Sequence, residues 1–109
     1  MDVKSNVWLE VDGKVVMSLW RVRLLKAVEE TGSISKAAAA MDIPYRRAWE
    51  KIHQSETRLG IKLIDTQVGG SGGGGAKITP AGKALIEKYT ALITGVDGLL
   101  RQRFHEIFD

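Results

Sequence analysis

The sequence predicts a mostly α-helical fold with small β-hairpins, and three observations support this fold class. Several stretches carry apolar residues three and four positions apart, which is the spacing of one helix face. Two shorter stretches, 7–17 and 62–79, instead carry β-branched or aromatic residues on both sides of glycine-containing turns. With 109 residues, 44% hydrophobic and 27% charged, the chain can build one core. We therefore expect one domain with extensions.

Residues 1–17 are predicted to be an N-terminal β-hairpin extension. Two apolar runs flank Asp12-Gly13, and this dipeptide favours a type I′ turn because both central residues of that turn need a positive φ. The hairpin therefore precedes the helical part of the chain.

Two helices are predicted next. The first begins at Ser18 and ends at Thr31, before a glycine. Ser33 and Ser35 offer hydroxyls that can cap a short alanine-rich second helix, 36–41. The apolar face of the first helix is expected to contain Leu19, Val22, Leu25 and Val28, with Leu24 as a further candidate.

A third helix is predicted over 44–59, with Pro44 as its first residue. Proline is tolerated there because its missing N–H would have no partner within the helix. The residues expected to face the core are Ala48, Ile52, Ser55 and Leu59.

Two strand-like pieces, 62–65 and 76–79, surround the glycine-rich run 69–75 and predict a β-hairpin with a long loop, which we call the wing. A run of this composition is also typical of an engineered linker. The flanking strand-like pieces favour the wing.

A long C-terminal helix is predicted from Thr79-Pro80 to about Phe108, because threonine can cap it and proline suits its first turn. Gly95 and Gly98 interrupt it, each costing about 1 kcal/mol in a helix interior, so a bend or break is expected there.

The order of these elements is that of a winged helix-turn-helix, in which the helix 44–59 would enter the major groove of DNA and the wing would lie along the backbone or minor groove. This domain would span 18–83, followed at 84–109 by a dimerisation helix continuous with the one that opens at Pro80. Residues 18–62 carry nine Lys and Arg against five Asp and Glu, the charge bias of a nucleic-acid-binding surface.

The residues also carry a family resemblance. Residues 23–49, with their Tyr-Arg-Arg-Ala-Trp run, the glycine-rich stretch 69–76 and the motif Ile78-Thr-Pro-Ala-Gly82 resemble the N-terminal DNA-binding domain of the ModE family of molybdate-responsive transcription regulators, and more distantly the LysR-type domain. The resemblance covers about residues 18–93. It implies a dimeric, cytoplasmic, prokaryotic transcription factor that binds a roughly palindromic operator near genes for molybdenum transport or molybdoenzymes.

The sequence departs from this family in three places. Pro44 replaces a serine that could meet a phosphate of the DNA. Asp65-Thr66 replaces a Glu-Arg pair, which removes an arginine expected to contact the DNA backbone. The molybdate-binding modules of the family would lie beyond Asp109, so direct molybdate binding is not expected.

Candidate DNA contacts fall into two groups. Arg46 is the first candidate for reading a base, because a guanidinium bonds bidentately to guanine. Tyr45 would stack at the groove wall or pack on the second helix, and Trp49 would meet a thymine methyl group or lie half-buried in the core. The residues expected to contact bases are Tyr45, Arg46, Trp49 and Glu50. Those expected to contact the DNA backbone are Ser33, Ser35, Lys36, Arg47, His53, Lys62, Gly72, Gly73 and Lys77.

The C-terminal helix is predicted to form a homodimer interface, because a chain this small cannot bury the apolar residues of both its halves. Most of the expected interface residues follow one another at steps of three and four, and Leu100 is adjacent to Leu99. The set is Leu85, Tyr89, Leu92, Val96, Leu99, Leu100, Phe104 and Ile107.

Other function classes find little support. His53 and His105 are isolated from each other, the glycine run lacks the Lys-Ser or Lys-Thr of a phosphate loop, and the chain has no cysteine. We therefore expect no enzyme, cofactor, metal site or membrane segment, and a cytoplasmic protein that binds double-stranded DNA as a homodimer. Two alternatives remain open: a sequence-tolerant DNA-coating protein, and a protein-interaction adaptor on the same scaffold.

Overall fold

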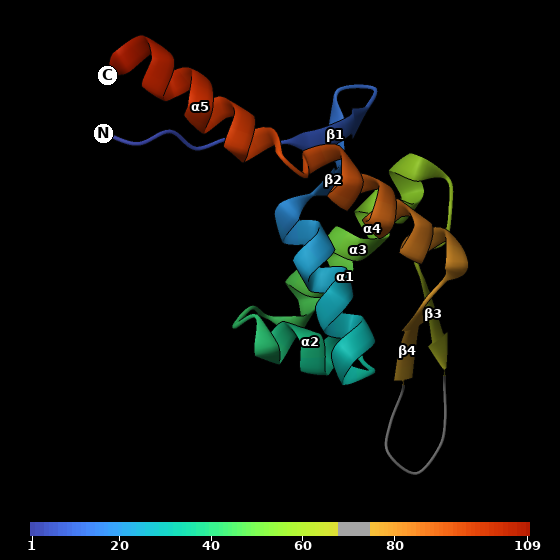
Figure 1. Ribbon diagram of the computed structural model, residues 1–109. Helices are drawn as coiled ribbons and strands as arrows, with labels where there is room; N and C mark the ends of the chain where they lie inside the picture. The colour runs from blue at the N-terminus through green and yellow to red at the C-terminus, as the bar shows by residue number, and fades with distance from the viewer. Residues whose placement is uncertain (68–74) are drawn as a thin grey trace.

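The computed structural model describes residues 1–67 and 75–109, and it confirms the mostly α-helical fold with two small hairpins (Figure 1). Its central part is a helix-turn-helix followed by a two-stranded wing, which confirms the predicted architecture. The elements are β1 (Trp8–Val11), β2 (Lys14–Ser18), α1 (Leu19–Thr31), α2 (Ile34–Ala40), α3 (Tyr45–Leu59), β3 (Ile64–Gln67), β4 (Gly75–Ile78), α4 (Pro80–Ile93) and α5 (Val96–Phe108).

The N-terminal hairpin, β1 and β2, is antiparallel, as expected. Its turn places Asp12 at φ 52° and Gly13 at φ 77°, the two positive values of a type I′ turn. Tyr89 ties the hairpin to α4, because its hydroxyl donates a hydrogen bond of 2.7 Å to the Val7 carbonyl. The hairpin is therefore packed on the body of the molecule.

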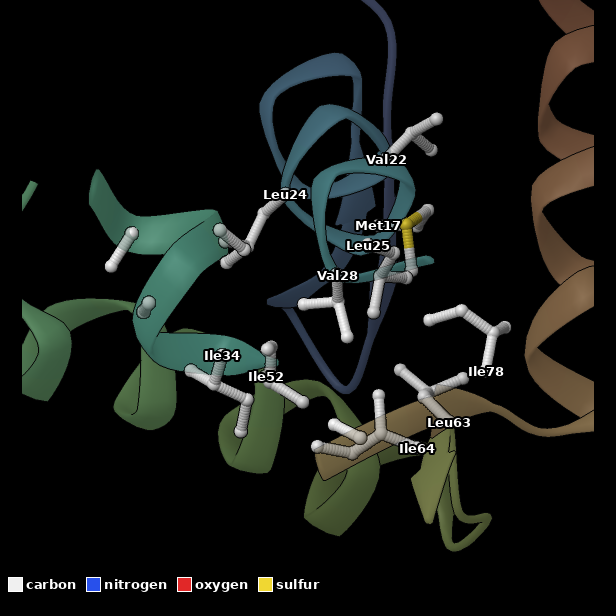
Figure 2. Close-up of a cluster of buried hydrophobic side chains, with 14 of the residues drawn as sticks. Met17, Val22, Leu24, Leu25, Val28, Ile34, Ile52, Leu63, Ile64 and Ile78 are labelled. Carbon is white, nitrogen blue, oxygen red and sulfur yellow. The ribbon is translucent and has the colours of Figure 1, made fainter. Parts of the chain in front are cut away.

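The core is built around α1 (Figure 2). Leu24 and Leu25 are at most 2% exposed and face residues of α2, α3 and the wing base. Leu19 is 41% exposed, so its predicted place in the core is wrong. At about 100° per residue, Leu19 lies about 200° around the helix from the buried Arg21. Arg21 belongs to the buried face, which sequence reasoning missed.

The turn between α2 and α3 differs slightly from expectation. Ser33 caps α2 by accepting a hydrogen bond of 3.0 Å from the Lys36 amide, so α2 starts at Ile34, two residues before the predicted start. Pro44 is the N-cap residue of α3 with an extended ψ of 143°, so the predicted range 44–59 is one residue too long at its start.

The wing base is fixed to the helices on two sides. The Ala76 amide donates to the Gly32 carbonyl at 2.8 Å, and the Thr79 amide donates to the Leu63 carbonyl at 3.0 Å. A Cβ at Gly82 would lie 2.6 Å from the Leu63 carbonyl oxygen, so only glycine allows α4 to approach this closely. The first strand begins at Ile64 rather than Lys62, because residues before it pack as a connection to α3.

The helical C-terminal region extends from Pro80 to Phe108 as predicted, but it is not continuous. Thr94 has an extended ψ of 124° and Gly95 a φ of 84°, and together they separate α4 from α5. Gly98 lies within α5 and does not break it. The tendency of glycine to break a helix was therefore predicted correctly, and Gly95 is the position where the break occurs. None of the residues of α5 is buried, and α5 extends away from the body (Figure 1).

Candidate nucleic-acid interface

The outward face of α3 gathers the four residues predicted to read bases. Tyr45, Arg46, Trp49 and Glu50 line one shallow depression, and all four are exposed. They share this face because Trp49 and Glu50 lie one helical turn after Tyr45 and Arg46, respectively. A helix is about 10–12 Å wide and the major groove about 12 Å, so this face can lie on the groove floor.

Arg46 and Glu50 form an ion pair on this face. The Nε atom of Arg46 lies 3.3 Å from Oε1 of Glu50, one helical turn away. Both side chains are well exposed, so the pair adds little to stability. The pair keeps the guanidinium beside the depression that both residues line.

Trp49 packs on His53 and not in the core. The ring centroids are 3.9 Å apart, and 42% of Trp49 is exposed, so the half-buried core position expected as an alternative is wrong. Nδ1 of His53 lies 3.5 Å from Oε1 of Glu56. His53 thus supports the tryptophan ring, and its contact with the DNA backbone remains a prediction.

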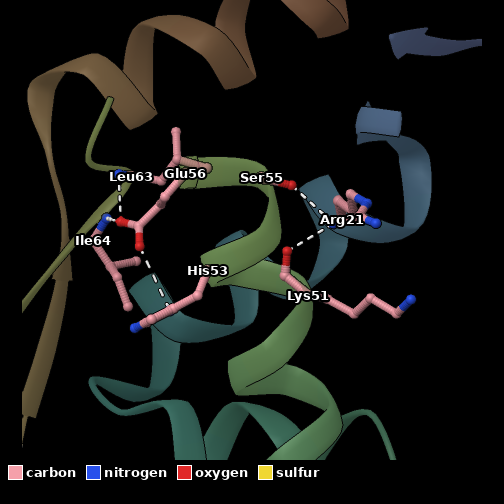
Figure 3. A network of polar contacts seen from close by, with 7 residues as sticks. All are labelled: Arg21, Lys51, His53, Ser55, Glu56, Leu63 and Ile64. Carbon is pink, nitrogen blue, oxygen red and sulfur yellow. Dashed lines mark hydrogen bonds and ion pairs between the residues drawn. The ribbon is translucent and has the colours of Figure 1, made fainter. Parts of the chain in front are cut away.

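Glu56 joins α3 to the wing (Figure 3). Its Oε2 accepts hydrogen bonds from the amides of Leu63 at 2.8 Å and Ile64 at 3.3 Å. The wing base therefore has a fixed position relative to the outward face of α3. Sequence reasoning missed this residue, since a glutamate eight positions before a strand belongs to no local motif.

Arg21 is buried between α1 and α3 (Figure 3). Its Nη1 donates to the Lys51 carbonyl at 2.7 Å and to Oγ of Ser55 at 2.9 Å. Burial, and secondly the charge of Arg58, lower the pKa of Arg21. The inward position predicted for Ser55 was the available signal, because a buried hydroxyl requires a partner.

The described residues predicted to contact the DNA backbone lie at α2, on α3, on β4 and in the connection before β3. Ser35 and Lys36 are exposed in the first turn of α2, where backbone amides and the helix dipole favour a phosphate. Lys77 points outward from β4 between two buried neighbours, and Lys62 is exposed just before β3. The guanidinium carbon of Arg47 lies 5.7 Å from the centre of the Trp20 ring. Gly72 and Gly73 lie outside the residues that the structure describes.

Some of the residues predicted to form the dimer interface pack against the core of their own chain, and others are exposed on α4 and α5. Tyr89 is 2% exposed within its own chain, so its assignment to the interface is wrong, because its ring fills the space between α4 and the hairpin. Leu85 is half-buried against the core. The exposed apolar residues are Leu92, Leu99 and Ile107, together with Phe108, which was not predicted, and Val96, Leu100 and Phe104 are half-buried.

The described residues, 1–67 and 75–109, contain no group of three or more His, Asp or Glu side chains placed to hold a metal ion. Within the same residues, no helix is both long and apolar enough to cross a membrane.

A family model described as bacterial regulatory helix-turn-helix protein, LysR family, matches residues 19–83. The chain is 42% identical over 84 residues to the molybdenum-pterin-binding protein MopB of Rhodobacter capsulatus, covering 77% of the chain and 31% of MopB. It is 42% identical over 94 residues to the transcriptional regulator ModE of Yersinia pestis, covering 86% of the chain and 36% of ModE. The chain thus spans about a third of the length of these relatives.

Among solved structures, the chain is similar to the BenM_DBD/catB site 1 DNA complex, with a TM-score of 0.59 and 28% sequence identity over 85% of the chain and 98% of that protein. The CbnR_DBD–DNA complex matches with a TM-score of 0.60 at 22% identity, covering 83% of the chain and 97% of that protein, and supports the fold alone.

Proposed function

The chain belongs to the LysR family of bacterial regulatory helix-turn-helix proteins, and from this premise we propose that it binds a specific double-stranded DNA site and regulates transcription. The observation that carries the proposal is the outward face of α3, where Tyr45, Arg46, Trp49 and Glu50 lie together and exposed. The BenM structure, which has the same fold, is a complex with DNA.

In the proposed complex, α3 lies in the major groove and Arg46 reads a guanine, with Glu50 holding the guanidinium from one turn away. The amides at the start of α2 and the lysines at the wing base bond to phosphates, which set the orientation of the domain without reading sequence. The name of the MopB relative refers to molybdenum-pterin binding, but the match covers 31% of that protein, so the proposal is limited to DNA.

We further propose that the DNA-binding form is a homodimer joined through α5. A helix of 13 residues without a buried side chain is marginal in water by itself. Leu99 and Ile107 are 61% and 69% exposed, and a second copy would cover both. Two recognition helices related by symmetry would then meet successive major grooves, about 34 Å apart.

The first experiment is a selection of genomic fragments at about 150 mM salt, followed by titration of the best fragment against random DNA. A recurrent palindrome bound at least about 1,000-fold more tightly than random DNA supports the proposal. Equal affinity for all fragments would instead indicate a DNA-coating protein, and no affinity at all would indicate an adaptor.

Arg46→Ala tests the role of the recognition face. We expect the variant to lose about 1–3 kcal/mol of specific binding and to relax the preference at one base pair of each half-site. Arg23→Ala is the matched control, because Arg23 is an exposed arginine on α1. If the variant keeps the discrimination of the original protein, the assignment of Arg46 is wrong.

A further inference from the structure

One flank of α3 carries a group of cations that the recognition face does not use. Arg47, Lys51 and Arg58 are spaced by four and seven residues, so they lie on one side of the helix, about 100° around it from Arg46 and Glu50. Arg21 of α1 inserts beside them. The ion pairs found among residues 1–67 and 75–109 include none of these four cations.

Three of these cations, Arg21, Arg47 and Lys51, line a surface pocket between the N-terminal segment, the start of α1 and α3. Asn6 comes from the segment before β1, Trp8 from β1, Trp20 from α1, and Arg47 and Lys51 from α3. The guanidinium groups of Arg21 and Arg58 donate hydrogen bonds of 2.7 Å to the backbone carbonyls of Lys51 and Val15, and these bonds join α1 to α3 and α3 to β2 beside the pocket. The pocket is therefore a fixed part of the fold.

The electrostatics of the pocket favour an anion. Burial, and secondly the charge of Arg58, lower the pKa of Arg21, and none of the ion pairs among residues 1–67 and 75–109 places a carboxylate beside it. The N-terminal end of α1, the positive end of the helix dipole, opens on the pocket at Ser18, and its first turn contains no acidic residue. An anion bound here would reduce the repulsion among all these groups.

We propose that this pocket binds the sugar–phosphate backbone of the DNA, so that the N-terminal hairpin extension is part of the DNA interface. The inference rests on the function proposed above. A helix that fills the major groove turns its flanks toward the phosphates that line the groove, and Lys51 and Arg47 lie on such a flank. Lys51 would pair with one phosphate, and the Asn6 amide would donate a hydrogen bond to the same strand.

Lys51→Gln tests the charge in the pocket. Its backbone carbonyl, which accepts the bond from Arg21, is kept. The probe is a random-sequence duplex of about 40 base pairs, long enough for two half-sites one helical turn apart. We expect the slope of log affinity against log salt concentration to become smaller by about one unit per site occupied. Lys88→Gln, at an exposed lysine of α4, is the matched control and should leave the slope unchanged.

Asn6→Ala tests the contribution of the hairpin. A neutral donor displaces no counterion, so we expect a several-fold loss of affinity with an unchanged salt slope. Ethylation interference adds a measurement that a change in folding would not move. Ethylating one particular phosphate should lower the affinity of the original protein for the DNA. It should not lower the affinity of Lys51→Gln, because that variant has already lost the contact.

The outcomes separate this inference from the proposed function. If the original protein discriminates its selected site while Lys51→Gln keeps the full slope and the same interference pattern, the pocket does not bind the backbone and an acidic protein segment becomes the candidate occupant. If the original protein shows no affinity for either DNA, the proposed function itself fails.

Discussion

The body formed by the hairpin, α1 to α4 and the wing base differs sharply from α5. In the body, Met17, Val28 and Leu63 are completely buried, and side-chain bonds connect elements that are far apart in sequence. In α5, the residues that repeat every three and four positions are exposed or half-buried. The same amphipathic spacing thus has two outcomes, because one set of apolar residues finds its partners within the chain and the other does not.

Because of this difference in burial, we expect the two regions to have different roles. The body should fold alone and hold the recognition face in place, whereas α5 should contribute to self-association more than to folding. The same substitution, leucine to alanine, can be made in both regions and should separate these roles.

Leu25→Ala should have the largest effect on folding. Leu25 is 2% exposed, and removing its side chain leaves a cavity in the core, which costs about 3 kcal/mol of unfolding free energy. Urea denaturation followed by circular dichroism measures this cost. A loss below about 1 kcal/mol would mean that the body is not the tightly packed unit described above.

Tyr89→Phe should have an intermediate effect. It removes the hydroxyl that donates to the Val7 carbonyl and leaves that acceptor without its partner, at a cost of about 1 kcal/mol. Amide exchange of residues 1–7 should become faster, because this bond holds the segment on α4. Tyr45→Phe is the matched control, since Tyr45 is 53% exposed and should lose almost nothing.

Leu99→Ala should have the smallest effect on folding, below about 0.5 kcal/mol in dilute solution, because Leu99 is 61% exposed. Self-association should respond instead, with a dimer dissociation constant raised at least about tenfold, since each copy loses a buried leucine. Sedimentation equilibrium measures the constant. An unchanged constant would remove α5 from the interface and break the division of roles.

Much of the fold could be predicted from local signals. Asp12-Gly13 specified the first hairpin, Ser33 and Thr79 capped their helices, and helical spacing located α1 and α3. The exposure of Tyr45, Arg46, Trp49 and Glu50 on one face of α3 followed from the same spacing, because exposure on a helix repeats with its period.

The wrong predictions concern residues whose burial depends on contacts with residues far away in the sequence. The Arg21 and Ser55 pair is 34 residues apart, and the two ends of the Tyr89 bond are 82 apart. A spacing of three and four residues describes a buried face and an exposed one equally well, which is why Tyr89 was assigned to the wrong surface. Glycine predicted a break in the last helix, but the choice of Gly95 over Gly98 depends on where α4 leaves the body.

Gly95 has a consequence for the geometry of a dimer. Its φ of 84° is one that other residues rarely adopt, and this dihedral sets the direction in which α5 leaves α4. In the proposed dimer, two symmetry-related copies of this angle would determine the vector between the two recognition helices. The number of base pairs between the half-sites of an operator would then depend on the backbone at Thr94 and Gly95, which is separate from the residues of α3 proposed to contact bases.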